Sequence, residues 1–260
     1  MPGFEKWLQE NRELRMDANS PLFPDERRAF HLDRYAFAAR YCPGLEVLDG
    51  ACGTGYGTAL LATVAKKVIG IDCAADSIAY AREQYGRPNT EFVCSYVEHT
   101  PFAADRFDAV VSFETVEHTL CPRSHMMEIA RTLKRTGKAI LSVPNAWGYT
   151  EHHFFDFDLA MLEDLVRRFF KRVEFYSQNV RGSKQPGIHA LGPGSAGGQC
   201  VLAVCEDPDK SQVAKDPYAY IMEEIYANVF MRHGEFRSLL YRQNTSLMMR
   251  AINKARSLTR

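Results

Sequence analysis

Apolar segments and amphipathic segments alternate regularly in the first half of the chain. Five apolar runs predict β-strands, at residues 45–48, 67–71, 90–94, 107–113 and 138–143. Between them, amphipathic patterns predict helices that end near residue 65 and that span residues 77–85 and 124–133. Strands that alternate with helices form βαβ units, and near-continuous apolar strands are typical of a parallel sheet covered on both faces. The pattern therefore predicts an α/β fold with three layers.

The pattern changes on both sides of this alternating region. Before it, residues 1–20 are polar, and residues 25–41 have a helical pattern that ends at Pro43 and Gly44. After it, the sequence predicts in order an irregular aromatic segment, a helix, a strand, a long loop, a last strand and two tail helices, at residues 145–158, 159–170, 172–178, 179–198, 199–205, 217–230 and 235–258. The two late strands would complete a mixed seven-stranded sheet, and the tail would pack on the core or on a second copy of the chain.

Composition and charge narrow the class of protein. Lys plus Arg equal Asp plus Glu at 32 each, so we expect neither nucleic acid nor an anionic membrane as a partner. No apolar run is long enough to span a bilayer, and the polar N-terminus lacks the apolar segment of a signal peptide. The seven cysteines include no C-x-x-C pair. We therefore expect reduced thiols, a cytoplasmic protein and no bound metal.

A glycine-rich turn follows the first predicted strand. The strand ends at Asp49, and the next residues read G-A-C-G-T-G-Y-G, with glycines at 53, 55 and 57. Glycines let a backbone bend tightly around a ligand, and this turn lies at the carboxyl end of a strand, where open α/β sheets bind ligands. A dinucleotide fingerprint would need Gly or Ala at Thr58, and a P-loop would need a lysine that is absent. The spacing therefore argues against both phosphate-binding motifs.

An acidic residue ends the second predicted strand. Asp72 closes the run V-I-G-I-D, and Cys73 follows it. A carboxylate there can accept hydrogen bonds from both hydroxyls of a ribose, although a lone Asp could equally cap the next helix. Together with the glycine turn, Asp72 indicates a bound nucleoside.

These motifs resemble the class I S-adenosylmethionine-dependent methyltransferases, especially the branch that acts on small molecules in ubiquinone and glycan pathways. The resemblance rests on D-x-A-C-G-T-G-Y-G from Asp49, on V-I-G-I-D, and on R-F-D-A-V-V-S-F-E-T-V-E-H ending at His118. It implies a Rossmann-like three-layer sandwich with a seven-stranded sheet whose last strand is antiparallel. It also implies an N-terminal helical lid at residues 1–43, a methyltransferase domain at 44–206 and a C-terminal helical extension at 207–260.

The resemblance implies S-adenosylmethionine as the cofactor and S-adenosylhomocysteine as the product. Gly53 and Gly55 would approach the amino-acid part of the cofactor, Asp49 would orient the turn or contact the amino group, and Asp72 would hold the ribose. The full set of expected cofactor-binding residues is Tyr35, Asp49, Gly50, Ala51, Gly53, Gly55, Tyr56, Asp72, Cys73, Ser95, Tyr96, Val97, Ser112 and Phe113.

Two parts of this set need comment. Family members often place an acidic residue where Tyr96 stands, so the adenine would instead be held by a backbone group or the Ser95 hydroxyl, with Tyr96 and Val97 as walls. On the helix before the sheet, Tyr35 could close over the methionine carboxylate and Arg34 could pair with it.

The acceptor site is expected at the same edge of the sheet. Its candidate residues are Glu114, His118, Trp147 and Tyr149; Glu114 and His118 are four apart and would share a face if this segment is helical. His152 and His153 are the candidate general bases, because a histidine titrates near neutrality. Residues 151–156 also offer a metal-ligand set of Glu151, His152, His153 and Asp156, although we expect no metal.

Several functions remain open on the sequence. The first is an O-methyltransferase acting on a sugar hydroxyl in glycan or glycoside biosynthesis. The alternatives are an N- or C-methyltransferase on an amine or quinone precursor, a non-catalytic subunit that binds the cofactor, and an NAD oxidoreductase, which Thr58 disfavours.

Overall fold

The computed structural model describes residues 2–12, 15–148, 152–179, 186–192, 194–195, 197–214 and 217–226. The candidate residue Tyr149 and the expected helix at 235–258 lie outside these ranges. Among the described helices, none combines the length and apolar character needed to cross a membrane.

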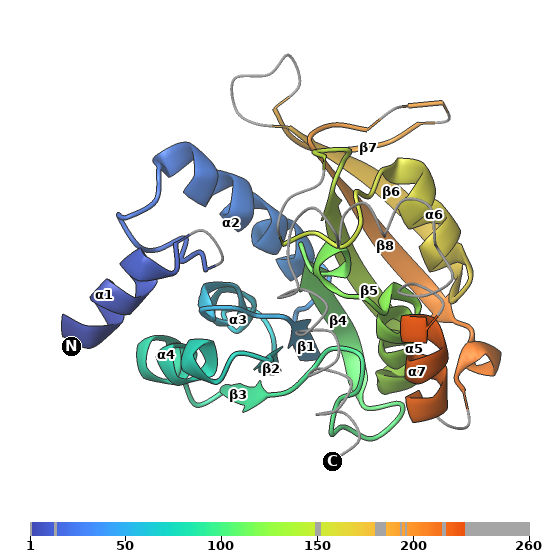
Figure 1. Cartoon of the computed structure of the whole chain (residues 1–260), viewed down its shortest axis with the longest axis horizontal. Helices are drawn as coiled ribbons and strands as arrows, with labels where there is room; N and C mark the ends of the chain where they lie inside the picture. Colours follow the sequence, from blue (N-terminus) through green and yellow to red (C-terminus); the bar gives the residue numbers. More distant parts are fainter. Residues whose placement is uncertain are drawn as a thin grey trace.

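One sheet runs through the centre of the molecule (Figure 1). Its strands are β1 (Glu46–Gly50), β2 (Lys67–Asp72), β3 (Thr90–Cys94), β4 (Phe107–Phe113), β5 (Leu133–Pro144), β6 (Phe170–Asn179), β7 (Gly187–Ala190) and β8 (Cys200–Pro208). The strand order is β3-β2-β1-β4-β5-β8-β6-β7. The first five strands are parallel, β8 is antiparallel to β5 and β6, and β7 is antiparallel to β6. The Rossmann-like mixed α/β fold predicted from the sequence is therefore confirmed.

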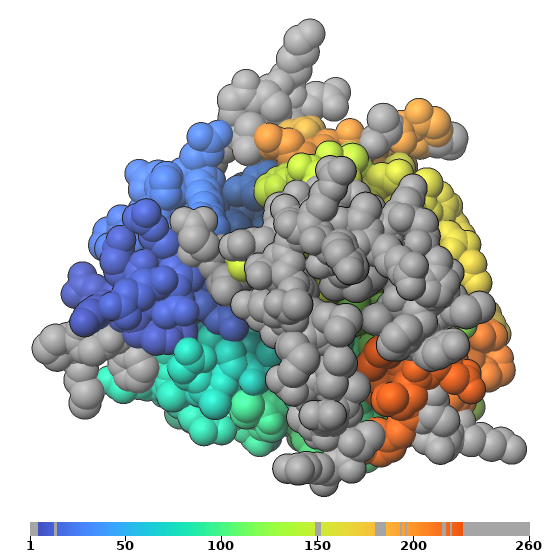
Figure 2. Space-filling model, in the orientation of Figure 1, coloured from blue at the N-terminus to red at the C-terminus, as the bar shows by residue number. Residues whose placement is uncertain are grey.

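Helices cover both faces of the sheet (Figure 1). One side carries α2 (Asp25–Ala39), α3 (Tyr56–Leu61) and α4 (Ala75–Tyr85), and the other carries α5 (Pro122–Thr132), α6 (Leu159–Arg167) and α7 (Pro217–Tyr226). The helix α1 (Pro2–Glu10) packs Leu8 beside Tyr80 of α4. Figure 2 shows α1 and α4 as neighbouring parts of one surface. Two short 3-10 helices, η1 (Val116–His118) and η2 (Lys210–Gln212), complete the described elements.

Two apolar cores result from the alternation of side chains along each strand. In β1, Val47 faces the core under α2 and α3, while Leu48 faces the core under α5 and α6. Ile140 and Leu141 divide in the same way in β5. Since both faces are buried, the strands need apolar side chains at nearly every position.

The strand count differs from the sequence prediction. An eighth strand, β7, forms within the 179–198 segment that was predicted to be a loop throughout. It pairs with the end of β6, and Ile188 packs against the core under α2. The prediction was wrong here because β7 has four residues, G-I-H-A, too few to show a strand period.

The helix α7 is fastened to the N-terminus of α5 by one carboxylate. Glu224 accepts hydrogen bonds from the backbone N–H groups of Arg123 and Ser124 at 2.8 Å each, and from the Ser124 hydroxyl at 2.6 Å. Ile221 packs beside Leu120 and Cys121. The described part of the C-terminal extension is therefore attached to the core.

Candidate active site at the carboxyl edge of the sheet

The turn after β1 leaves the strand through three residues in the left-handed backbone region. They are Ala51, Gly53 and Gly55, with φ of 59°, 55° and 90°. A Cβ added to Gly55 would lie 2.7 Å from the Ala81 Cβ, so this glycine is required by packing. A Cβ added to Gly53 would meet nothing within 4 Å. Gly53 therefore presents bare backbone to open space, as a ligand that approaches a main chain closely requires.

Asp49, at the end of β1, fixes the start of this turn through side-chain hydrogen bonds. It is fully buried at the end of β1, and its carboxylate accepts a hydrogen bond from the Thr58 hydroxyl at 2.6 Å and one from the Tyr35 hydroxyl at 3.2 Å. Burial raises the pKa of Asp49 to about 7, although the two hydroxyl groups oppose this. Asp49 thus joins the turn to both α2 and α3, and Thr58, which ruled out a dinucleotide fingerprint, is one of its anchors.

Asp72 lies beside the turn, at the end of β2. One carboxylate oxygen accepts from the Gly53 N–H at 3.1 Å, and the other accepts from the Ala74 N–H at 2.9 Å. A carboxylate has about four acceptor positions, so two remain after these bonds. The next residue, Cys73, is exposed. The geometry fits a diol held by Asp72 in front of Gly53.

Aromatic rings from α2 close one side of the turn. The Tyr35 ring meets Tyr56 and Phe113 edge-on, with centroids 5.5 and 5.1 Å apart. It also fills the space where a side chain at Gly57 would stand, 2.0 Å from an added Cβ. All three rings are buried, so Tyr35, Tyr56 and Phe113 form a wall between α2 and the ends of β1 and β4.

Arg34 pairs with a protein carboxylate from another element. Its side chain is 1% exposed, and its Nη1 lies 3.2 Å from Oε1 of Glu114. The Glu114 charge raises the pKa of Arg34, against the effect of burial. Within the described residues, the charged partner of Arg34 is therefore Glu114, and Nη2 of Arg34 also lies 3.0 Å from Nδ1 of His31.

The segment after β3 is a compact turn. Its start is fixed by the Ser95 N–H, which donates to the Asp72 carbonyl at 3.0 Å. The Ser95 hydroxyl donates to the Tyr96 carbonyl at 3.2 Å, which leaves its oxygen able to accept. Tyr96 packs against Leu120 and Cys121. Ser95 is thus held next to Asp72 by a main-chain hydrogen bond.

A buried histidine that sequence reasoning missed connects two of the predicted residues. His125 of α5 is 2% exposed, and its Nδ1 donates to the Val97 carbonyl at 3.2 Å. Its Nε2 therefore accepts from the Ser112 hydroxyl, at 3.1 Å. These two hydrogen bonds link β4 to the segment that follows β3. No local motif announces them, because the residues that they join lie far apart in the sequence.

The segment from Glu114 to His118 is helical only from Val116 onward. Glu114 has a left-handed φ of 49°, and η1 begins only at Val116. Glu114 and His118 therefore do not share a helical face: Glu114 turns to Arg34, whereas His118 donates through Nδ1 to the His152 carbonyl at 2.8 Å. The condition for a shared face, a helix through both residues, is not met because the chain leaves β4 through a left-handed residue at Glu114.

The segment after β5 brings both candidate bases to this edge of the sheet. The His153 and His118 rings meet edge-on, with centroids 4.8 Å apart, and the Phe154 N–H donates to the Glu117 carbonyl at 2.7 Å. Burial lowers the pKa values of His118 and His153. Trp147 is 55% exposed, and its indole N–H donates to the Gln199 carbonyl at 2.6 Å.

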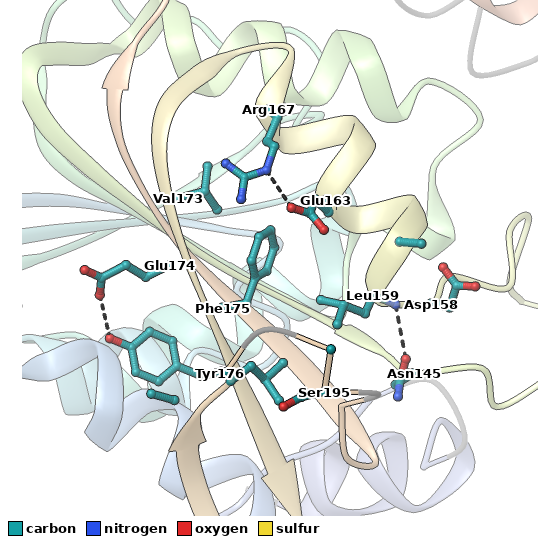
Figure 3. A pocket seen from close by; sticks show the side chains of 15 residues that line it. Asn145, Asp158, Leu159, Glu163, Arg167, Val173, Glu174, Phe175, Tyr176 and Ser195 are labelled. Atoms are coloured by element: carbon teal, nitrogen blue, oxygen red, sulfur yellow. Dashed lines mark hydrogen bonds and ion pairs between the residues drawn. The ribbon is translucent and has the colours of Figure 1, made fainter.

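A separate cavity of about 930 Å³ lies at the β6–β7 end of the strand order, between α6 and β6. Figure 3 shows the Phe175 ring there, below the ion pair of Arg167 and Glu163. This cavity contains none of the glycine-turn residues and neither candidate base. We therefore assign the chemistry to the carboxyl edge of β1, β2 and β4, where the bare backbone and the acidic side chains meet.

Part of the chain is similar in sequence to known methyltransferases. Residues 48–141 match the family described as "Methyltransferase domain". A probable S-adenosylmethionine-dependent methyltransferase of Mycobacterium tuberculosis is 33% identical over 111 residues, which are 43% of this chain and 40% of that protein. A ubiquinone biosynthesis O-methyltransferase of Cereibacter sphaeroides is 32% identical over 123 residues, 46% of this chain and 49% of that protein. The chain thus spans less than half the length of these two relatives.

The fold of this chain is similar to that of solved methyltransferase structures. A SAM-dependent methyltransferase of Thermotoga maritima superposes with a TM-score of 0.58, over 79% of this chain and 95% of that one, at 16% identity. At this identity the likeness concerns the fold alone.

Proposed function

We propose that the chain is a class I S-adenosylmethionine-dependent methyltransferase that transfers a methyl group to a small-molecule acceptor, a proposal supported by the match of residues 48–141 to a methyltransferase domain. One observation carries the proposal: the bare backbone of Gly53 faces open space while its N–H is held by the carboxylate of Asp72. These two groups present a main-chain cradle and a diol acceptor side by side.

The residues of the site divide by the part of the cofactor that each would contact. Gly50, Ala51, Gly53 and Gly55 would line the amino-acid part, and Asp72 with Cys73 would hold the ribose. Ser95, Tyr96 and Val97 would surround the adenine, and Tyr35, Tyr56, Ser112 and Phe113 would enclose the sulfonium end. Asp49 would act beneath them, because its carboxylate already joins Tyr35 and Thr58. Residues 1–43 would serve as the lid of the 44–206 domain, with 207–260 as its extension.

The chemistry is a direct displacement. When bound, the sulfonium supplies an activated methyl group: the S–CH3 bond breaks as the acceptor oxygen forms an O–CH3 bond. The protein aligns the acceptor behind the methyl carbon and excludes water, so positioning supplies much of the rate. An alcohol must also lose its proton, and His152 or His153 would take it.

The acceptor we propose is a sugar hydroxyl in glycan or glycoside biosynthesis. The exposed indole of Trp147, fixed by its bond to Gln199, supports this because a flat ring can stack on a sugar face. Glu114 and His118 would contact the acceptor from the end of β4. A phenolic acceptor is the alternative, favoured by the similarity to a ubiquinone biosynthesis O-methyltransferase.

The cofactor assignment is tested by calorimetry with S-adenosylhomocysteine and, separately, NAD. We expect the first to bind and the second not to bind. Asp72→Asn should weaken binding at least about tenfold, because the amide loses one acceptor oxygen. Asp76→Asn is the matched control, since Asp76 lies on α4 and bonds the Trp7 indole. Equal affinities for both variants would remove Asp72 from the site.

The acceptor and the base are tested by turnover. A panel of nucleotide sugars, phenols and amines, with S-adenosylmethionine as donor, would identify the acceptor class. His152→Ala and His153→Ala combined should abolish most transfer to an alcohol. Unchanged turnover in this double variant would eliminate the histidine base.

A further inference from the structure

Three side chains with metal-ligating atoms meet between η1 and the segment after β5. They are Glu117, His118 and His153, and one ligand atom from each lies within 4.8 Å of the others. Glu117 is buried, His153 is half-buried and His118 is exposed. The cluster therefore has a buried base and an open top, at the edge of the sheet where the methyl acceptor is proposed to bind.

The Glu117 carboxylate is buried without a hydrogen-bond donor among the described residues. Its side chain is 1% exposed, and within the described part of the chain neither of its oxygens has a hydrogen-bond partner. The charge of Arg34 offsets that of Glu117 only in part, because the Arg34 guanidinium is paired with Glu114. A buried carboxylate without donors is costly, and a bound cation is one of the few groups that removes this cost.

The tautomer of His118 is fixed in the form that ligates metal ions. Its Nδ1 lies 2.8 Å from the His152 carbonyl, which can only accept, so Nδ1 carries the proton. The lone pair of the neutral ring is then on Nε2, 3.9 Å from Oε1 of Glu117. A histidine whose second nitrogen donates to a carbonyl is the usual arrangement around protein-bound metals.

His153 is held beside these two by the backbone. The Phe154 N–H donates to the Glu117 carbonyl at 2.7 Å, which fixes the segment against η1. The His153 ring then lies edge-on to His118, with centroids 4.8 Å apart. The third ligand is therefore brought in by main-chain contact from a different part of the sheet edge.

We propose that Glu117, His118 and His153 bind one divalent transition-metal ion, such as Zn²⁺, through one carboxylate and two imidazoles. Two histidines and a carboxylate form a catalytic zinc-type set that leaves coordination positions open. Imidazole ligands favour Zn²⁺ and its neighbours over Mg²⁺ and Ca²⁺, which prefer oxygen. This proposal replaces the expectation of no bound metal. The proposed site shares only His153 with the metal-ligand set that the sequence offers at residues 151–156.

The role of the ion rests on the proposed function. An acceptor hydroxyl that occupies an open position loses its proton more readily, because the cation stabilises the alkoxide. Its proton would pass to the His152 imidazole or to solvent, and the alkoxide oxygen would take the methyl group as the sulfonium becomes a thioether. His153 as a ligand cannot also be the base. The acceptor class is accordingly one that chelates, such as a sugar with neighbouring hydroxyls.

The test is metal binding by the full chain after removal of metal with a chelator. Calorimetry with Zn²⁺ should give one ion per chain, and Co²⁺ should give the visible absorption of a histidine-bound ion. Glu117→Gln and His153→Asn should each weaken Zn²⁺ binding at least about tenfold. His189→Asn is the matched control, since His189 lies on β7 and bonds the Pro186 carbonyl. It should bind Zn²⁺ as the parent does.

The outcomes separate this site from the cofactor site. S-adenosylhomocysteine binding is measured on the same samples, and its retention shows that each variant is folded. A parent chain that binds S-adenosylhomocysteine but no metal overturns the metal site and leaves the methyltransferase proposal intact. Zn²⁺ binding that is equal in Glu117→Gln, His153→Asn and the parent also overturns it. Metal binding without S-adenosylhomocysteine binding counts against the proposed function instead.

Discussion

At the scale of single residues, the most consequential group is the carboxylate of Asp49. It lies at 0% exposure beneath the glycine turn, and its hydrogen-bond partners within the described part of the chain are two hydroxyl groups, from Tyr35 and Thr58. Two neutral donors compensate an ionised buried carboxylate poorly, which is why its pKa is raised to about 7. Asp49 therefore connects three elements at the cost of a titratable group in the core.

This arrangement predicts a pH dependence of stability. Between the usual aspartate pKa and about 7 the folded chain holds a proton at Asp49 that the unfolded chain releases, so the Asp49 contribution to stability falls as pH rises through this window. Asp49→Asn should remove this loss. Relative to the parent, the variant should gain roughly 2–3 kcal/mol between pH 5 and pH 8. Urea unfolding of both chains at the two pH values measures the difference, and a parallel response of both would contradict it.

At the scale of elements, α7 and α5 are joined by a side chain that caps a helix from outside it. Glu224 supplies the acceptors that the first N–H groups of α5 lack within their own helix. A carboxylate at this end is also favoured by the helix dipole. The contact ties the beginning of the C-terminal extension to the core.

Removing this carboxylate should loosen α7. Glu224→Ala leaves the N–H groups of Arg123 and Ser124 without their acceptor and should cost about 1–2 kcal/mol. Hydrogen exchange of residues 217–226 should quicken, while the exposed neighbour Glu223 provides the control variant, Glu223→Ala. Equal protection in the two variants would show that apolar packing alone holds the helix.

Most helices and strands were predictable, because a buried strand or helix shows a periodic pattern of apolar residues in its own local sequence. The β4 run and the α4 pattern needed no distant partner to be recognised. The start of β5 was missed because Lys134 and Arg135 interrupt the apolar run, and β7 was missed because it is short. The glycine turn and Asp72 were found for the same local reason.

Contacts between distant residues could not be predicted in this way. Arg34 and Glu114 are far apart in the sequence, and nothing near either residue indicates the pairing. The partners of His125, and the lack of a hydrogen-bond donor to the Glu117 side chain among the described residues, likewise depend on how strands and loops come together. The candidate metal ligands were sought in 151–156, whereas two of the three lie in η1.

At the scale of the whole molecule, the covering of both sheet faces controls which thiols meet solvent. Cys42, Cys52, Cys121, Cys200 and Cys205 are buried, whereas Cys73 and Cys94 are exposed at the carboxyl edge of the sheet. Cys73 directly follows Asp72, so under the proposed function it borders the bound ribose. The thiols therefore report both on folding and on occupancy of the site.

We expect about two thiols per native chain to react quickly with an aromatic disulfide reagent, and the other five only after unfolding. S-adenosylhomocysteine should slow one of the two fast thiols several-fold, and Cys73→Ser should remove that sensitive thiol. Fast labelling of more than two thiols in the native chain would contradict the described burial.

The sheet order has a consequence for how the chain is made. β6 pairs only with β8 and β7, both of which follow it in the sequence. β5 likewise keeps one open edge until β8 arrives, since β8 pairs with it along residues 138–144. A chain emerging from the ribosome therefore carries β6 without a neighbour, and β5 with an unprotected side, until residues 200–208 have been synthesised. Premature termination before that point would leave strand edges with unpaired N–H and C=O groups, which can pair with other chains and cause aggregation.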